Sequence, residues 1–479
     1  MLNFHSRFLS LRSLALSAAA CASLISIPGV YAADDDSGAS APSYSNDKTG
    51  EVLSTLGAMI DAKNFDGALQ ALQGLIPTEN PDTYDMAIID DTIAKIYFQG
   101  KDQPANAIAY WEKMWALIKA HPEYMTGKDL IDHYYFMAQA YFLEASTLKT
   151  GDARQPELYD KSIEYTRHWL AATPKLTPEE RLFVTELFYY KALSGGTDKI
   201  DMDALKETKH QAEEALVTEL KPKEVYYQIL FQIAQQENDF LTSAKYLEYL
   251  VKVHPTGAGA KDYWQQLWAV YNNLAVGADK DPRQQRIYYA LAIDTVERAQ
   301  ALGFSNSLKD NFNLVTLYNE VGQYGKAAEL MYDGLKSGKI EDTRKNWEIL
   351  SYFYRLMSHD LQAVNILKEA ESMEKYKDLG DIDREIAEIY VSLDDTQNTY
   401  IYAKKAVEKD HFDGKAYVSY QYLAYAAYEL GKLEEALQVC EEALKIPDAP
   451  KELTTLRDGI TQAIKVRDAE KAMIKAEIK

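Results

Sequence analysis

Cysteine is almost missing from this chain, with two residues among 479. So few thiols exclude a disulfide-stapled scaffold and a cysteine-rich zinc site. Positive charge is also scarce, because 52 Lys and Arg face 73 Asp and Glu, for a formal net charge of −21. Nucleic acids and anionic lipids bind to clustered positive charge, so the composition argues against both as general partners.

Motifs of catalysis are missing as well. None of the eight histidines forms a His-Glu-x-x-His or similarly spaced metal-ligand pair, and no glycine-rich phosphate loop occurs. Ser194-Gly195-Gly196 lacks the pattern of a nucleophile elbow and indicates a loop. We therefore predict no enzyme activity, no catalytic residues, no bound metal and no cofactor.

Other reactive side chains have simpler interpretations. His121 and His254 each precede a proline, which is typical of a helix C-terminus. The pairs Asp90-Asp91 and Asp394-Asp395 are expected at helix starts or on solvated faces, and Cys440 is expected to be a buried, inert thiol.

The first 32 residues have the pattern of an export signal. Arg7 and Arg12 precede an apolar run over residues 14–27, and Val30-Tyr31-Ala32 places small residues where a signal peptidase reads them. We expect cleavage after Ala32, followed by a flexible leader over residues 33–50. No later stretch holds 18 consecutive apolar residues, so we expect no transmembrane span in the mature chain.

Two other interpretations of this segment stay open. The apolar run could anchor the chain in a membrane, although it is shorter than the roughly 20 residues that a span needs. The sequence before Cys21 could instead be a lipoprotein cleavage box with Cys21 lipidated, although it lacks the usual leucine three residues before the cysteine.

A repeat of about 36 residues runs through the rest of the chain. Trp347, Leu350, Tyr354 and Ala363 follow one another at spacings of 3, 4 and 9 residues, which is the tetratricopeptide pattern of two antiparallel helices. The small second-helix position recurs at Ala327, Ala363, Thr399 and Ala436, spaced by 36, 36 and 37 residues. The other structural repeat positions are Trp264, Tyr271, Tyr318, Tyr390 and Tyr420.

The repeat predicts an all-α fold, a tetratricopeptide α-solenoid that forms a right-handed superhelix of about ten helix pairs without a sheet. We expect N-terminal units with insertions over residues 51–216, central units over 217–304, regular units over 305–449 and a capping helix over 450–479. Residues 149–155 should form a longer turn, and 279–286 should hold extra residues. The abundance of tyrosine, 35 residues, follows from the aromatic repeat positions.

The first helix of each unit should line the inner side of such a superhelix. We call its positions one, five, eight and nine residues after the Trp-like position the outward positions. They hold many amides, which can hydrogen-bond the backbone of an extended peptide or can simply be solvated. The residues that we expect in such a groove are Gln228, Gln232, Gln235, Gln236, Gln265, Asn272, Asn273, Asn319, Tyr352 and Arg355.

An aromatic set lies nearer the N-terminus. Phe98, Tyr135 and Phe142 fall at comparable positions. They either form an apolar docking patch or are covered by the fold.

Several segments go beyond the general repeat. Residues 263–271 (YWQQLWAVY), 327–341 (AAELMYDGLKSGKIE), 346–350 (NWEIL) and 167–170 (RHWL) resemble the periplasmic tetratricopeptide proteins linked to TonB systems. The resemblance covers roughly residues 50–450, and the inserts near 150 and 280 depart from the family's spacing.

This resemblance implies an accessory of the TonB–ExbB–ExbD system that assists uptake through outer-membrane receptors in a Gram-negative periplasm. It carries over no catalytic residues. A different scaffold role, in envelope assembly, polysaccharide export or secretion, is the alternative.

Overall fold

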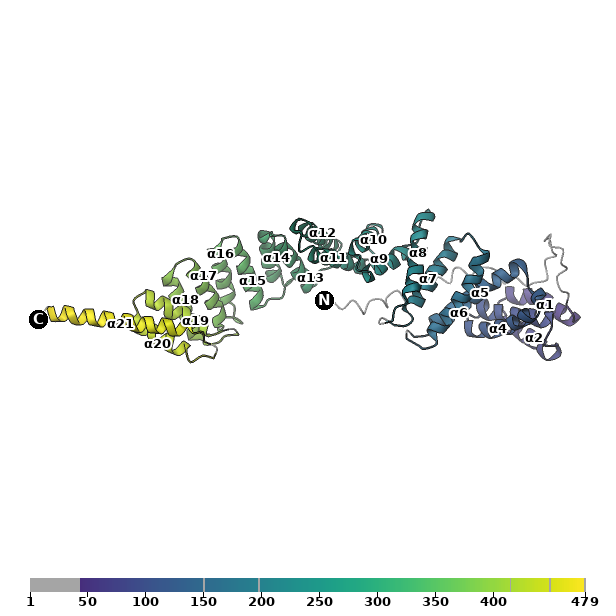
Figure 1. Cartoon of the computed structure of the whole chain (residues 1–479), viewed down its shortest axis with the longest axis horizontal. Helices are drawn as coiled ribbons and strands as arrows, with labels where there is room; N and C mark the ends of the chain where they lie inside the picture. Colours follow the sequence, from purple (N-terminus) through teal and green to yellow (C-terminus); the bar gives the residue numbers. More distant parts are fainter. Residues whose placement is uncertain (1–43, 150, 197–198, 414, 448, 478–479) are drawn as a thin grey trace. The chain divides into compact units, whose positions relative to one another are not determined.

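The computed structural model describes residues 44–149, 151–196, 199–413, 415–447 and 449–477. The predicted export signal over residues 1–32 and most of the predicted leader lie outside this part. Every regular element in it is helical, with 21 α-helices, two short 3₁₀ helices and one π-helical turn, and no strand (Figure 1). The predicted all-α fold is confirmed.

The chain divides into two compact units between Asp239 and Phe240. This boundary lies inside the stretch 217–304 that the sequence assigns to the central repeats. The helices of the N-terminal unit are α1 (Asp47–Asp61), α2 (Phe65–Gln73), α3 (Tyr84–Lys95), α4 (Pro104–Ala120), α5 (Gly127–Thr147), α6 (Gln155–Ala172), α7 (Pro178–Leu193), α8 (Met202–Thr218) and α9 (Glu224–Gln236).

The helices of the C-terminal unit are α10 (Phe240–Val253), α11 (Ala260–Gly277), α12 (Pro282–Ala301), α13 (Leu308–Glu320), α14 (Tyr324–Ser337), α15 (Arg344–Leu356), α16 (Asp360–Glu371), α17 (Gly380–Ser392), α18 (Thr396–Lys409), α19 (Tyr417–Glu429), α20 (Leu433–Ala443) and α21 (Glu452–Glu477).

Within each unit, successive helices pack as hairpins, and neighbouring hairpins pack on one another. In the N-terminal unit α3 pairs with α4 and α5 with α6, while α4 also contacts α5. In the C-terminal unit α15 pairs with α16 and α17 with α18, while α16 also contacts α17. A single hairpin cannot bury its apolar face, so stacking gives each unit a shared core. This is the tetratricopeptide type of solenoid.

The repeat positions explain why these helices meet. Ala327, Ala363, Thr399 and Ala436 are all buried on second helices, as the spacing predicts. Trp347 is 1% exposed, and its indole Nε1 donates a hydrogen bond to Asp342 Oδ1 at 2.7 Å. The burial of a large ring, with its polar edge satisfied, therefore fixes the hairpin in place.

The tyrosine excess has a second cause besides packing. Tyr271 donates a hydrogen bond to Glu248 Oε1 at 3.1 Å, and Tyr318 donates one to Glu297 Oε1 at 2.5 Å. In each case the glutamate belongs to the preceding second helix, so the bond joins one hairpin to the next. Tyr354 and Tyr420 are only half-buried and depart from this pattern.

The linker after α14 has a clear physical reason. Gly338 ends the helix in the left-handed region, with φ of +72°. Ile340 then folds back against Gly334, where an added Cβ would lie 2.6 Å from the Ile340 Cδ1. Glycine at position 334 is therefore required for this close approach.

The extra residues expected near 280 are divided between the short turn that joins α11, which ends at Gly277, to α12, which begins at Pro282, and the first turn of α12. One expectation at the N-terminus needs correction. The end of the expected flexible leader is folded, because α1 begins at Asp47 and the backbone N–H groups of Ser45 and Asn46 donate to the Asp85 carboxylate.

The C-terminal end agrees with the sequence. Helix α21 begins at Glu452, and its Leu453 and Ile460 are buried against the last hairpin. Cys440 is buried as expected, and its thiol contacts the Leu453 carbonyl at 3.2 Å.

Replacing Trp347 with Ala should lower the free energy of unfolding by about 3–5 kcal/mol, because a fully buried ring is removed. Chemical denaturation of the full chain measures this loss. The matched control, Tyr352→Ala, removes an exposed ring from the same helix and should change the free energy by about 0.5 kcal/mol or less. Equal losses in the two variants would contradict the assigned packing.

Candidate partner-binding surface

First helices of neighbouring hairpins contact one another directly. In the C-terminal unit α15 contacts α17, and α17 contacts α19. In the N-terminal unit, side chains bridge α3 to α5 and α7 to α9. The outward positions of these helices therefore lie beside one another, and their burial decides whether a partner can reach them.

Two outward positions near the end of the C-terminal unit are exposed. Tyr352 on α15 is 54% exposed, and Tyr425, at the equivalent position of α19, is 46% exposed. The equivalent position of α17, the first helix between them in repeat order, is Glu388. Its Oε1 atom lies 3.5 Å from Nη1 of Arg355, so the two side chains form an ion pair. Two exposed phenol rings and an ion pair thus occupy three successive repeats.

Tyr425 and Glu388 are absent from the sequence prediction. The repeat spacing of 36 and 37 residues, counted from Tyr352, predicts both positions if the register is continued into the last two repeats.

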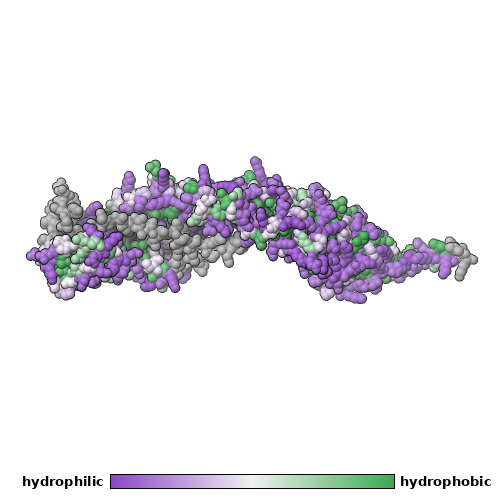
Figure 2. All heavy atoms as spheres, turned by 180° about the vertical axis from the view of Figure 1, so that it is seen from behind, coloured by the Kyte–Doolittle hydropathy of each residue, from purple (hydrophilic) through white to green (hydrophobic). Residues whose placement is uncertain are grey.

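On the face drawn in Figure 2, hydrophobic side chains lie in small patches between hydrophilic ones.

The predicted amides differ in accessibility. Gln228 is 6% exposed and donates to Glu224 Oε1 at 2.9 Å, so its prediction as a groove residue is wrong. Gln232 is half-buried, and its Oε1 accepts a hydrogen bond from the Tyr189 hydroxyl at 2.7 Å. Both side chains are held by their own chain. Gln236 is exposed, whereas the half-buried members are Gln235, Gln265, Asn272, Asn273 and Asn319.

The aromatic set Phe98, Tyr135 and Phe142 is covered by the fold and does not form an apolar docking patch. Phe98 and Phe142 are buried, so they form no docking patch. Phe98 packs on Trp111 with ring centroids 5.4 Å apart. Tyr135 is half-buried and stacks on Trp169 at 4.5 Å. Outward positions of α5, and of the π-helical turn Ile96–Gly100 that follows α3, are thus closed by aromatic packing.

The prediction that Asp90 and Asp91 lie at a helix start or on a solvated face is wrong. Both residues are buried in the middle of α3. Asp91 Oδ1 accepts hydrogen bonds from Trp111 Nε1 at 3.0 Å and His133 Nε2 at 2.6 Å. Its Oδ2 lies 2.8 Å from Lys95 Nζ. This cluster joins α3, α4 and α5.

The electrostatics of the two neighbours differ. Burial alone would raise the pKa of Asp91, but Lys95 and His133 lower it well below its ordinary value. Burial raises the pKa of Asp90 to about 6 against the opposing charge of Lys113. The second acidic pair follows the prediction, because Asp395 caps the N-terminus of α18.

The C-terminal unit has a comparable cluster. Asp383, buried on α17, lies 2.5 Å from Lys409 Nζ, which also pairs with Glu371 at 3.2 Å. Burial, with the charge of Glu371, raises the pKa of Asp383 to about 6 although Lys409 opposes it. These charges tie α17 to α16 and α18.

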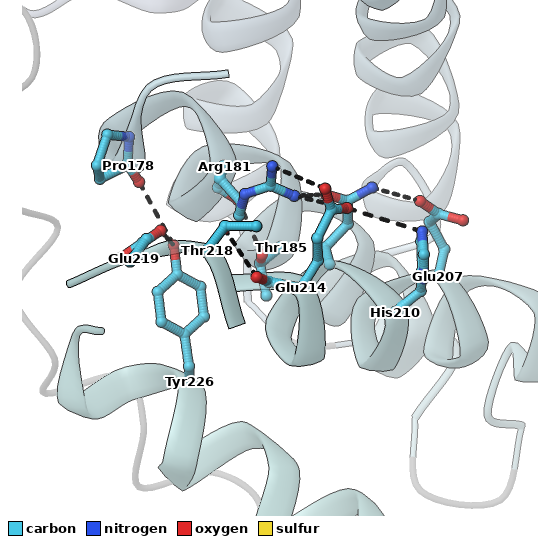
Figure 3. Close-up of polar contacts among 10 residues, drawn as sticks. Pro178, Arg181, Thr185, Glu207, His210, Glu214, Thr218, Glu219 and Tyr226 are labelled. Carbon is cyan, nitrogen blue, oxygen red and sulfur yellow. Dashed lines mark hydrogen bonds and ion pairs between the residues drawn. The ribbon is translucent and has the colours of Figure 1, made fainter. Parts of the chain in front are cut away.

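Figure 3 shows how α7 and α8 are held together where the repeat is weakest. Arg181 replaces the large aromatic, and its Nη1 donates to Gln211 Oε1 at 3.1 Å and pairs with Glu214 Oε2 at 2.8 Å. Tyr226 of α9 donates to Glu219 Oε1 at 3.2 Å. Polar contacts thus replace an aromatic anchor in this hairpin.

The described residues contain no group of three or more His, Cys, Asp or Glu side chains placed to hold a metal ion. None of the helices that the structure covers combines the length and apolar character that a membrane span requires.

Comparison with known proteins identifies no family for this chain. No protein-family model matches the chain, and no curated protein matches it. The chain is similar to the APC/C hetero-tetramer Cut9-Hcn1, with 12% identity over 87% of this chain and 91% of that one, and a TM-score of 0.26. It is also similar to the P58(IPK) TPR domain, with 11% identity over 88% and 99% and a TM-score of 0.22. The stacked hairpins themselves define the fold.

The buried carboxyls make stability depend on pH. The pKa values of Asp90 and Asp383 are about 6, above the ordinary 3.8, so each contributes stability that is fully present below pH 3.8 and is lost as pH rises through 6. We expect the melting temperature to rise as pH is lowered from about 7.5 to about 5.5. Asp90→Asn, which cannot ionise, should raise the melting temperature at pH 7.5 by about 2–4 °C and flatten this dependence.

Thermal denaturation followed by circular dichroism measures the effect. Glu213→Gln, which removes an exposed carboxylate from α8, should leave the profile unchanged. A melting temperature that falls over the same interval, in the parent chain and in Asp90→Asn alike, would contradict the assignment.

Proposed function

We propose that this chain is a non-enzymatic adaptor that holds protein partners in the periplasm, as an accessory of a TonB–ExbB–ExbD system for outer-membrane nutrient uptake, such as that of iron–siderophore complexes. The export signal, the repeat array and the resemblance of residues 263–271 and 327–350 support this proposal. Tetratricopeptide arrays bind other proteins through the surfaces that stacked hairpins create.

The observation that carries the adaptor role is the open row on the C-terminal unit. Tyr352 on α15 and Tyr425 on α19 expose rings at equivalent repeat positions, and Glu388 of the intervening first helix α17 forms an ion pair with Arg355 of α15. Tyrosine offers a large rigid apolar area and a polar tip, and it is enriched where proteins bind one another. The row therefore suits an extended peptide segment of a partner.

Affinity purification after crosslinking in the native cells tests the system to which the adaptor belongs. We expect TonB, ExbB or ExbD to be recovered with the tagged chain. Recovery of an envelope-assembly, polymer-export or secretion complex in their place would contradict the TonB assignment and favour the alternative scaffold role.

The export step has its own test. N-terminal sequencing of the mature protein should begin at Ala33-Asp34-Asp35-Asp36, and cell fractionation should place the protein in the periplasm. A mature chain that begins at a lipidated Cys21 would instead mean that the protein is anchored to a membrane.

The double variant Tyr352→Ala, Tyr425→Ala should weaken binding of the purified partner by at least about tenfold, since two exposed anchors are lost. Calorimetric titration measures the affinity. Leu361→Ala, which truncates an exposed side chain on the second helix α16, is the matched control and should bind normally. Unchanged affinity of the double variant would exclude this row as the binding surface.

A further inference from the structure

One half-buried carboxylate on α7 lacks a hydrogen-bond or ion-pair partner among the residues that the structure describes. Glu186 lies five residues after Arg181, which makes it the outward position equivalent to Gln232 of α9 and Tyr352 of α15. Its side chain is half-buried, yet it makes no hydrogen bond or ion pair with any residue that the structure describes. Two half-buried carboxylates on other first helices are paired, Glu348 with Arg344 and Glu388 with Arg355.

Aromatic rings flank this carboxylate. Phe183 precedes Glu186 by three residues and Tyr190 follows it by four, so all three share one face of α7. The rings of Phe183 and Tyr190 both contact Phe142 of α5, at centroid distances of 5.7 and 5.9 Å. The carboxylate thus lies between fixed rings whose π-faces attract cations.

The cation that acts on Glu186 is already engaged. Lys223, which precedes α9, lies 3.3 Å from the Oε1 atom of Glu179, the second residue of α7. The hydroxyl of Tyr226 on α9 donates to Glu219, while α5 presents the uncharged ring of Phe142 on its side. Burial raises the pKa of Glu186 to about 7, and Lys223 lowers it only in part.

The chemistry of the surroundings selects the ligand. An anionic group would be repelled by the carboxylate, and a neutral donor could hydrogen-bond it but would leave its negative charge unpaired. A divalent cation would need several oxygen ligands, and Glu186 supplies the single carboxylate of this position. A cationic side chain satisfies both the carboxylate and the rings.

We propose that Glu186, with Phe183 and Tyr190, receives a lysine or arginine side chain from a partner protein. This site lies on the N-terminal unit, apart from the tyrosine row of the C-terminal unit. The proposal rests on the adaptor role, because the cation belongs to a protein partner. It does not depend on the TonB assignment.

Binding of a cation at this site must be linked to protons. At pH 7 a carboxyl whose pKa is near 7 is about half protonated, and a neighbouring cation favours its ionised form. The bound complex therefore releases about half a proton at pH 7, and binding strengthens as pH rises from about 6 to about 8. A cation bound merely to an exposed carboxylate would release none.

Titration calorimetry of the full mature chain tests the site. The probes are the tripeptides acetyl-Gly-Lys-Gly-amide and acetyl-Gly-Arg-Gly-amide, with acetyl-Gly-Gln-Gly-amide as the uncharged control. Repetition in buffers of different ionisation enthalpy gives the number of protons released. We expect saturable binding of a charged tripeptide with about half a proton released at pH 7, and no binding of the glutamine tripeptide.

The variants separate this site from general attraction to an acidic protein. Glu186→Gln keeps the shape of the side chain and should lose the proton release and weaken binding at least tenfold. Glu213→Gln, which removes an exposed carboxylate from α8, should behave as the parent chain. Unchanged binding and proton release in Glu186→Gln would overturn the proposal, and so would the absence of saturable binding by either charged tripeptide. Neither result bears on the Tyr352 row, whose test uses a separate variant.

Discussion

Mutual burial between neighbouring hairpins is the constraint on which this structure depends. A single hairpin has too little interior to bury Trp347 or Trp264 by itself, so each hairpin buries its large rings against a neighbouring hairpin. Hydrogen bonds from tyrosines to glutamates of the preceding hairpin, such as that from Tyr318 to Glu297, then satisfy the polar tips of the buried rings. The same residues that form the core therefore also hold each hairpin against its neighbour.

The two units use their first helices differently. In the N-terminal unit Phe98 and Phe142 fill the outward positions and pack inward, which closes that surface. In the C-terminal unit Tyr352 and Tyr425 remain exposed at equivalent positions. The array therefore contains first helices that are closed by aromatic packing and first helices whose surface can receive a partner, with Glu186 as the exception on the closed side.

The sequence predicts the repeat positions well because a helix of fixed period places small and large residues at fixed spacings, as Ala363 and Trp347 illustrate. It fails where burial depends on the neighbouring hairpin. Gln228 reads as an outward amide but is covered, and Asp91 reads as a surface acid but is buried with His133 and Lys95. The pairing of Asp91 with His133 spans 42 residues of chain, and such a long pairing has no local signal.

Hydrogen exchange of the Trp347→Ala variant, followed by mass spectrometry, tests the shared core most directly. If hairpins stabilise one another, protection should fall in α15 and α16 and also in the adjoining α14 and α17, while the helices α1 to α9 keep theirs. Loss confined to α15 and α16 would mean that each hairpin is stable by itself, which would contradict a core shared between neighbouring hairpins.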